Sequence, residues 1–402
     1  MEENKLAYKV SESFLKLKNY CEAQQYKGWD PYDGLNSKIF NGLPFKKWDI
    51  ARLAWIQIFK RSPINFRKLL LVPKEHNAMG VGLFLQGYCK LYELARKGNT
   101  DFGSEKRLLE KIHELSNLLI SLKTEGYSGA CWGYNFDWQA RRLFLFPKYT
   151  PTAVATTFCA EGLIMAYEAT GKKDYLDVAL SSAEFVKNDL NRTTHKSGFL
   201  FSYSPFNGNN TVFNASLLGA KLLALSYKYT KKQEHIETAE VAVKAVCESQ
   251  EKDGSWVYGL LPVQSWKDSF HTGFNLEAIN TYMEINQDFE LKKYLKKGTD
   301  FYLNNFFESE GLPKYYHNKT YPIDIHCPGQ LIVTLSKLDI FSENKELIDK
   351  VLKWTIDNMQ DNKGYFYYQI KKGISSKISY MRWSNAFMFN AMSSYFLETQ
   401  KE

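Results

Sequence analysis

Residues 233–258 read QEHIETAEVAVKAVCESQEKDGSWVY. The first part has the charged and apolar periodicity of an amphipathic helix, and the second part is a polar turn, a glycine and an aromatic cluster. The same order recurs around four glycines that lie 53 to 57 residues apart, namely Gly198, Gly254, Gly311 and Gly364. Two less regular copies surround Gly28 and Gly126. A period of this length indicates a protein built from repeated units.

A second helix is predicted after each aromatic cluster. These segments are rich in apolar and small residues, and they lie near 75–96, 151–169, 211–229, 269–286, 325–339 and 382–398. A helix that is apolar on nearly all sides must be buried. Charged and buried helices therefore alternate six times. This pattern predicts an all-α fold, an (α/α)6 barrel or toroid, with the charged helices in an outer ring and the buried helices in an inner ring.

The sequence predicts a single domain over residues 1–402, because closed repeat architectures often reach this length as one unit. Segments 199–201 and 365–369 alternate in polarity and predict short β-hairpins at the end that carries the long loops. Residues 36–74 do not follow the repeat, and we interpret them as an insertion or an extra helix. The long loops follow the outer helices, so binding residues are expected at that end.

The composition narrows the functional classes. Aromatic residues make up 15% of the chain, which suits both a core and sugar-binding faces. The net charge of +8 permits an acidic partner, but we interpret most of it as solvated helix faces, such as Lys292 and Lys293. No nucleic-acid module is present, so nucleic acid is not an expected partner. P-loop, dinucleotide, GxSxG and HExxH motifs are also absent from the sequence, and no cofactor is predicted.

The cysteines and the N-terminal residues bear on location. Six cysteines are scattered without a CxxC pair, which predicts reduced and mostly buried thiols. The chain starts with an amphipathic pattern rather than an apolar signal core. No stretch reaches the roughly 20 apolar residues that a membrane helix needs. We therefore expect no membrane span and a cytoplasmic protein.

Two resemblances follow from local motifs. The stretch Gln250 to Trp256 resembles the glutamine–tryptophan motif of squalene-type cyclases, in which these residues brace outer helices. The acidic cyclisation motif of that family is absent from the sequence, which argues against cyclase chemistry. The chain as a whole resembles the α/α-toroid superfamilies, which include six-hairpin glycosidases, unsaturated glucuronyl hydrolases and sugar epimerases.

A closer resemblance is to toroid proteins encoded in bacterial capsule and exopolysaccharide clusters. It covers most of the chain, and its motifs lie at 28–34, 132–139, 270–274, 324–326 and 382–383. The resemblance implies a role in the synthesis or turnover of a surface polysaccharide. Fold-level likeness by itself does not identify a reaction.

Candidate catalytic residues lie at the starts of the predicted inner helices, which converge on the axis of a toroid. Asp324 and His326 could form an acid–base pair, in which the carboxylate sets the tautomer and the pKa of the imidazole. Asp324 could instead cap the helix that follows. His271, beside Asp268, lies one repeat earlier and would face the same funnel. Two histidines and a carboxylate could hold a metal, but no ligand signature is present and no metal is predicted.

The aromatic loop before the second inner helix adds an acidic candidate, Asp137. It is flanked by Trp132, Tyr134 and Trp138, and desolvation by these rings would raise the pKa of its carboxyl group. A glycosidase needs two such carboxyl groups. Asp30 and Asp33 are alternatives, although an aspartate directly before a proline, as Asp30 is, is also typical of a turn.

The remaining candidates would bind or protonate a sugar. Arg382, Arg141 and Arg142 could clamp a carboxylate or phosphate, or brace loops through salt bridges. Tyr380 could donate a proton. Trp132 and Trp383 could stack on a sugar ring, whereas Trp256 fits a structural role. Further substrate-binding candidates are Asp30, Tyr32, Tyr134, Trp138 and Asp268.

Three functions remain open at this stage. The first is an enzyme that acts by acid–base chemistry on a glycan, expected to contain uronic acid, as a hydrolase, lyase or epimerase. The second is a non-catalytic glycan-binding or assembly factor, which would use aromatic rings and arginines without a pKa-perturbed pair. The third is a terpenoid-cyclase-like lipid enzyme, which would need an apolar cavity. The oligomeric state is not predicted.

Overall fold

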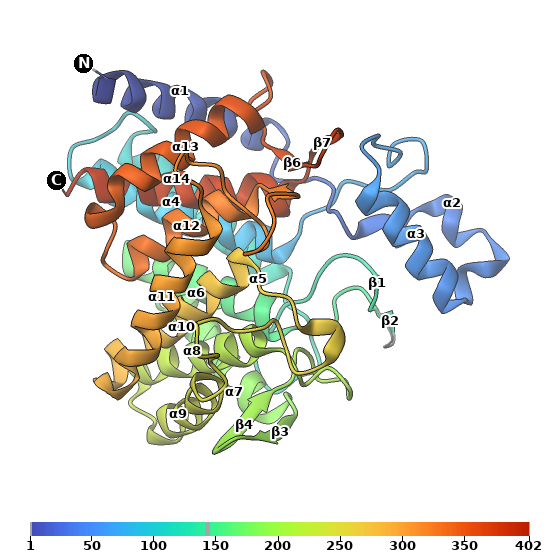
Figure 1. Ribbon diagram of the computed structural model, residues 1–402, viewed down its shortest axis with the longest axis vertical. Helices are drawn as coiled ribbons and strands as arrows, with labels where there is room; N and C mark the ends of the chain where they lie inside the picture. The colour runs from blue at the N-terminus through green and yellow to red at the C-terminus, as the bar shows by residue number, and fades with distance from the viewer. Residues whose placement is uncertain (1, 141–144, 402) are drawn as a thin grey trace.

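The computed structural model describes residues 2–140 and 145–401, including the backbone but not the side chains of residues 2–4. Six helices form a closed inner ring (Figure 1), namely α4 (Ala78–Arg96), α6 (Ala153–Thr170), α8 (Phe213–Thr230), α10 (Ser269–Asn286), α12 (His326–Lys337) and α14 (Phe387–Thr399). Each packs against the next, and α14 packs against α4. A π-helical turn, Met381–Ala386, leads into α14. The predicted (α/α)6 toroid is thereby confirmed.

The outer ring consists of the more charged helices. These are α1 (Glu2–Ala23), α5 (Glu105–Ser121), α7 (Lys173–Asn188), α9 (Gln233–Cys247), α11 (Lys292–Phe306) and α13 (Lys345–Met359). The N-terminal α1 lies beside α13, which comes from near the other end of the chain (Figure 1). One hydrophobic core runs through both rings, and all six cysteines are buried. Among the helices of the described residues, none combines the length and the apolar character that crossing a bilayer requires.

The repeated glutamine and tryptophan residues brace the outer ring. The Gln250 side-chain amide donates to the carbonyl of Tyr294 in α11 at 2.8 Å, and the Gln360 amide donates to the carbonyl of Ser13 in α1 at 2.9 Å. The indole of Trp256 is buried and donates to the carbonyl of Val246 at 2.9 Å. These contacts tie the outer helices α1, α9 and α11 to neighbouring segments, which is the bracing role that the resemblance to the cyclase motif implies.

The periodic glycines stand where the chain touches the next outer helix. Gly254 has a φ of +91°, and a Cβ added there would lie 2.3 Å from the carbonyl oxygen of Lys297. Gly364 has a φ of +100°, and its Cβ would lie 2.2 Å from the carbonyl oxygen of Lys16. Only glycine satisfies both the backbone conformation and the close approach. The glycines therefore recur at a regular spacing because each repeat must pack closely against the next outer helix of the ring.

Small antiparallel sheets lie at the long-loop end. Their strands are β1 (Trp138–Gln139) and β2 (Leu145–Phe146), β3 (Arg192–His195) and β4 (Gly198–Phe201), and β5 (Ile323–Asp324), β6 (Tyr367–Ile370) and β7 (Ser375–Ser379). The two predicted hairpin segments overlap β4 and β6. Strand β5 was not predicted, and its pairing with β6 sets Asp324 opposite Gln369.

The segment that does not follow the repeat forms a small helical insertion, defined here as residues 36–74. It contains α2 (Lys38–Asn41) and α3 (Asp49–Arg61), which project from the ring on the right of Figure 1. Leu35, Phe40 and Ile56 form a separate small apolar cluster beneath it. Short 3₁₀ turns complete the fold at Asp33–Asn36, Pro44–Lys47, Pro262–Gln264, Phe289–Leu291 and Ser342–Asn344.

Candidate functional site at the mouth of the inner ring

The mouth, defined as the end of the ring where the inner helices begin, is lined by one tyrosine from each repeat. We call these six residues the tyrosine collar: Tyr32, Tyr134, Tyr203, Tyr258, Tyr315 and Tyr368. Five of them are half-buried, and Tyr368 is fully buried. The hydroxyl groups of Tyr134 and Tyr203 share a hydrogen bond of 3.0 Å. The collar therefore combines mostly half-buried aromatic rings with hydroxyl groups, as a sugar-binding surface does.

The collar surrounds the other aromatic residues of the mouth. The ring of Tyr32 lies 5.7 Å from that of Trp383 and 6.3 Å from that of Trp138. Burial raises the pKa of Tyr258, and the nearby groups of Asp268, Tyr32 and Tyr134 raise it further. Tyr258 therefore stays protonated at neutral pH and can donate a hydrogen bond.

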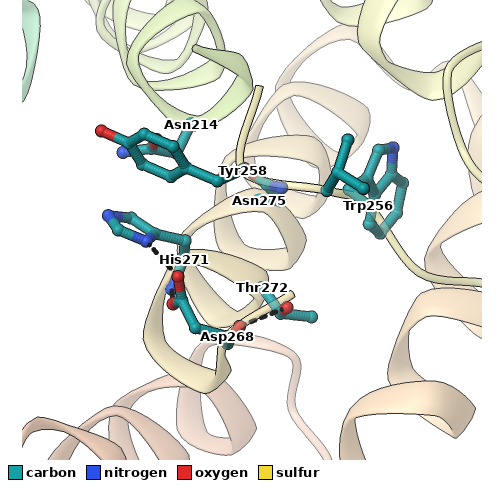
Figure 2. Close-up of a pocket in the computed structure, with 8 residues that line it drawn as sticks. Asn214, Trp256, Tyr258, Asp268, His271, Thr272 and Asn275 are labelled. Carbon is teal, nitrogen blue, oxygen red and sulfur yellow. Dashed lines mark hydrogen bonds and ion pairs between the residues drawn. The ribbon is translucent and has the colours of Figure 1, made fainter. Parts of the chain in front are cut away.

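A carboxylate–imidazole pair stands on the first turn of α10 (Figure 2). Asp268 is the N-cap of this helix; its Oδ1 accepts from the backbone NH of His271 at 3.0 Å, and its Oδ2 lies 2.7 Å from Nδ1 of His271. The indole of Trp266 also donates to Oδ2, at 2.9 Å. Asp268 is buried, whereas the His271 side chain is 20% exposed. The contact assigns the proton of the neutral ring to Nδ1 and leaves Nε2 as the basic nitrogen.

The pair lines a small pocket with the collar residue Tyr258, whose ring lies 4.6 Å from that of His271. Asn214, Thr272 and Asn275 also line it, as Figure 2 shows. A hydroxyl, two amides and an imidazole thus line one narrow pocket. These are groups that bind the hydroxyl groups of a sugar.

His326, at the start of α12, has a different environment. Its ring is stacked on Phe270 at 4.7 Å and lies 4.4 Å from the ring of Trp383 and 3.6 Å from that of Phe387. Burial lowers its pKa well below the usual value, and the charges of Arg382 and His271 act in the same direction. Neither ring nitrogen has a hydrogen-bond partner among the described residues. A buried, neutral imidazole with two unpartnered nitrogens points to a ligand or a water.

Asp324 and His326 are close in space, but not through their side chains. Oδ1 of Asp324 accepts from the backbone NH of His326 at 3.0 Å and from the indole of Trp383 at 2.9 Å. Oδ2 accepts from the amide of Gln369 at 2.5 Å. Burial raises the pKa of Asp324 to about 6, against the opposing effect of these hydrogen bonds. The side-chain pair expected at this position is formed instead by Asp268 and His271.

Arg382 is held at the mouth by a buried ion pair. Its Nε donates to Oδ2 of Asp30 at 2.7 Å, and its guanidinium group lies over the rings of Tyr134 and Trp383 at 5.0 and 5.2 Å. The structure therefore brings together Asp30, Tyr134, Arg382 and Trp383. Asp30 compensates the positive charge of Arg382. The arginine presents a cation at the mouth and also positions the rings of Tyr134 and Trp383.

Tyr380 lies behind this ion pair. It is fully buried, and the guanidinium group of Arg67 covers its ring at 4.7 Å. Burial raises its pKa. Arg67 is itself held by Asp33, through a bond of 2.6 Å from its Nε. The structure thus gives Tyr380 a core position with no surface for a substrate.

Residues of the aromatic loop lie in three different places: the core, the mouth and a second pocket. Trp132 is fully buried, and its indole donates to the carbonyl of Leu119 at 2.8 Å, as Trp256 does in its own repeat. Trp138 faces the mouth, 6.1 Å from the ring of Tyr203. Asp137 faces away from it into a second pocket, which Lys46, Lys47 and Arg52 of the insertion also line. Arg141 and Arg142 lie outside the described residues.

Metal-ligand geometry occurs away from the mouth. Within the described part of the chain, the one group of this kind is Glu184, Glu234 and His235 on the outer helices α7 and α9. Lys187 already contacts both carboxylates, at 3.2 and 2.9 Å. The histidines and carboxylates of the mouth do not converge in this way.

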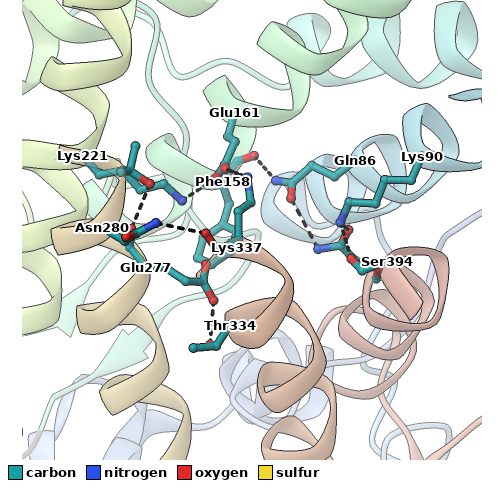
Figure 3. A network of polar contacts seen from close by, with 12 residues as sticks. Gln86, Lys90, Phe158, Glu161, Lys221, Glu277, Asn280, Thr334, Lys337 and Ser394 are labelled. Atoms are coloured by element: carbon teal, nitrogen blue, oxygen red, sulfur yellow. Dashed lines mark hydrogen bonds and ion pairs between the residues drawn. The ribbon is translucent and has the colours of Figure 1, made fainter. Parts of the chain in front are cut away.

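Below the mouth the ring is filled by a polar network, shown in Figure 3, which we call the barrel-axis network. Its ionisable members are Lys90, Glu161, Lys221, Glu277 and Lys337. Glu161 accepts from Lys221 at 2.8 Å and from Lys337 at 2.9 Å. Helices α6 and α12 lie on opposite sides of the inner ring, so the Glu161–Lys337 pair crosses the axis. A substrate is therefore expected to enter the mouth without passing through the ring.

Sequence reasoning missed four collar residues and the closed axis. Tyr258, Tyr315 and Tyr368 each stand four residues after the glycine of their repeat, and Tyr203 stands five residues after Gly198. This spacing of four or five residues is the signal that could have found them. The axis network has no such signal, because a charged residue within an apolar helix does not identify its partner.

Comparison with known proteins shows the fold. No protein-family model and no curated protein sequence matches the chain. An unsaturated glucuronyl hydrolase specific for heparin is similar over 100% of this chain and 99% of its own, with a TM-score of 0.63 and 12% identity. Cellobiose 2-epimerase from Bacillus thermoamylovorans is similar over 82% and 90%, with a TM-score of 0.59 and 11% identity.

A glycoside hydrolase family 76 mannosidase from Bacteroides thetaiotaomicron is also similar, over 85% of this chain and 92% of its own, with a TM-score of 0.59 and 12% identity. These neighbours are carbohydrate-active enzymes. At such low identity the likeness is one of fold, and the chemistry has to be argued from the residues of the mouth.

Proposed function

We propose that the protein is a carbohydrate-active enzyme that binds a glycan end at the mouth and moves protons with two histidines. The observation that carries the proposal is the pairing of unlike imidazoles, the carboxylate-oriented His271 and the neutral, unpartnered His326. Both rings contact Phe270, at centroid distances of 4.0 and 4.7 Å. The sugar-acting neighbours support the substrate class.

The two imidazoles suit the transfer of a proton to and from one sugar. Nε2 of His271 can accept a proton, because Asp268 stabilises the imidazolium ion that results. A neutral His326 can deliver the proton of its NH to the carbon while its other ring nitrogen takes up the proton that His271 accepted, so that both imidazoles return to the neutral form. Removal and return of a proton at a carbon beside a carbonyl group is an epimerisation. The electron pair of the broken C–H bond is held on the carbonyl oxygen, which a collar hydroxyl can stabilise.

A second candidate is hydrolysis, which the raised pKa of Asp324 favours. With a pKa of about 6, Asp324 is protonated in mildly acidic solution and could protonate a glycosidic oxygen. Hydrolysis needs a second carboxyl group. The other buried aspartates near the mouth are held by basic groups: Asp30 by Arg382, Asp33 by Arg67 and Asp268 by His271. The geometry therefore favours the imidazole pair over the carboxyl pair.

The class of glycan and its biological role are further parts of the proposal. Lys60, whose Nζ donates to the hydroxyl of Tyr32 at 2.6 Å, is a cation at the mouth that could bind the carboxylate of a uronic acid. A role in bacterial surface polysaccharide synthesis or turnover rests on the resemblance stated above.

The test is incubation with defined neutral and uronic-acid oligosaccharides in heavy water, followed by NMR and mass spectrometry. Deuterium at a sugar carbon without cleavage supports epimerisation; a new reducing end supports hydrolysis, and an unsaturated product indicates elimination. His271→Ala and His326→Phe are expected to remove the activity. His195→Ala, a half-buried histidine on β3, is the matched control and should retain it. Binding without any chemical change would contradict catalysis and indicate a glycan-binding protein.

A further inference from the structure

The excess positive charge of the protein lies in the insertion. Residues 36–74 contain nine lysine and arginine residues and one acidic residue, Asp49, so their net charge of +8 equals that of the whole chain. Positive and negative side chains are equal in number over the rest of the chain, even though some outer helices, such as α11, are cationic. The charge is therefore a local property of the projecting unit.

The same unit exposes large apolar side chains. On α3, Ile50 is 84% exposed and Ile58 is 53% exposed, and Ala54 between them is also exposed. Positions four residues apart lie on one face of a helix, so α3 presents an apolar stripe to solvent. Trp48, just before the helix, is 68% exposed. Of the 17 exposed large apolar residues in the part of the chain that the structure describes, seven fall in the insertion, namely Ile39, Trp48, Ile50, Ile58, Ile64, Leu69 and Leu71.

These side chains are not needed to fold the insertion. Its inward face is already packed, because Trp55 is stacked on Phe40 at 4.9 Å and Phe59 is buried. Arg67 also anchors it to the ring, donating to the carbonyl of Asp30 at 2.7 Å. The exposed apolar stripe is therefore free to contact a partner. The anchoring means that whatever binds the insertion is held in a defined position relative to the mouth.

We propose that the insertion docks the protein on the surface of an anionic lipid bilayer. Exposed isoleucine and tryptophan side chains can enter the interfacial region, while lysine and arginine side chains contact the headgroups. A second copy of the chain fits this surface poorly, since self-association would bring two faces of net charge +8 together. Lys46 and Lys47, which directly precede Trp48 and Ile50, provide the charge beside the apolar contact.

Docking has a consequence for the substrate. Lys60 of α3 contacts Tyr32 of the collar, so the mouth lies beside the docked unit. A glycan that reaches the mouth would then be attached to a lipid or held near the membrane. This consequence rests on the proposed function, whereas the docking itself does not.

The test is cosedimentation of the full chain with vesicles of phosphatidylcholine alone or with about one-third phosphatidylglycerol. Binding is expected to the anionic vesicles and not to the neutral ones, and to weaken at about 0.5 M salt because of screening. The double variants Trp48→Ser/Ile50→Ser and Lys46→Glu/Lys47→Glu are each expected to reduce partitioning at least about tenfold.

Matched controls lie elsewhere on the surface. Phe289→Ser/Ile374→Ser removes side chains that are 59% and 58% exposed, and Lys292→Glu/Lys293→Glu reverses two exposed charges on α11. Both should bind like the unaltered chain, and circular dichroism should show all variants folded. Absence of binding to anionic vesicles, equal binding to neutral ones, or equal losses in the controls would overturn the proposal. A dimer that Trp48→Ser/Ile50→Ser dissociates would identify a second copy as the occupant instead.

Discussion

The same six inner helices carry two polar regions with opposite properties. At the mouth, polar groups are left without partners or half exposed, as His326 and the tyrosine collar show. Along the axis, the Glu161 carboxylate contacts two lysines, and Lys90 donates to Asn390 and Ser394 at 2.7 and 2.6 Å. Unsatisfied buried groups point to a ligand or an ordered water. Satisfied charges mark structure, because removing one partner strands the others.

The largest expected effect is at the axis. Glu161→Ala leaves Lys221 and Lys337 without their shared counter-charge, and is expected to lower the free energy of unfolding by about 3–5 kcal/mol. Urea denaturation measures it. The control is Glu168→Ala, which removes a partner of Lys228 at 3.4 Å between half-exposed side chains and should cost under about 1 kcal/mol. If the two variants lose similar amounts of unfolding free energy, the barrel-axis network contributes no more to stability than a surface ion pair does.

The next effect is at the mouth. His326→Phe keeps a ring in contact with Phe270, Trp383 and Phe387 but removes both nitrogens. It is expected to reduce the rate of deuterium exchange or product formation at least about 100-fold, with an unfolding free energy within about 1 kcal/mol of the original. A variant that is destabilised but fully active would place His326 in the scaffold and remove the contrast between the two regions.

The smallest effect concerns the pH dependence of stability. Burial lowers the pKa of Lys90 to about 7, below its unfolded value of about 10.4. Between these values the unfolded chain binds more protons, so the free energy of unfolding rises with pH by up to about 1.4 kcal/mol per unit. In Lys90→Met this contribution disappears. In urea titrations, the unfolding free energy of the unaltered chain minus that of the variant should therefore increase from about pH 7.5 to 9.5. If this difference does not change with pH, Lys90 is not neutral in the folded protein.

The overall ring could be predicted because its cause is local and repeated. Alternating charged and apolar helices specify which helices are buried, and glycines such as Gly254 recur because each repeat approaches its neighbour in the same way. The insertion could be detected only as a break in that pattern. Its exposed stripe on α3 could not be predicted, because an apolar position does not reveal whether another element covers it.

Neighbouring residues of the aromatic loop show why the site was harder to predict. Asp137 and Trp138 are adjacent, but successive side chains of an extended segment point to opposite sides. Trp138 therefore reaches the mouth, and Asp137 lines the other pocket. Trp132 and Tyr380 were expected at the mouth by residue type, and the core positions they occupy depend on contacts with Leu119 and Arg67 from distant segments.

The two aspartate–histidine pairs show which features of the site the sequence determines and which the tertiary structure decides. The sequence by itself places His271 and His326 one repeat apart, at the starts of neighbouring inner helices. Asp268 precedes His271 by three residues, so that the helix cap faces the imidazole, whereas Asp324 precedes His326 by two residues on a strand. Only the folded chain decides that Asp324 contacts Gln369 and Trp383 instead, because those partners arrive from other repeats through long loops.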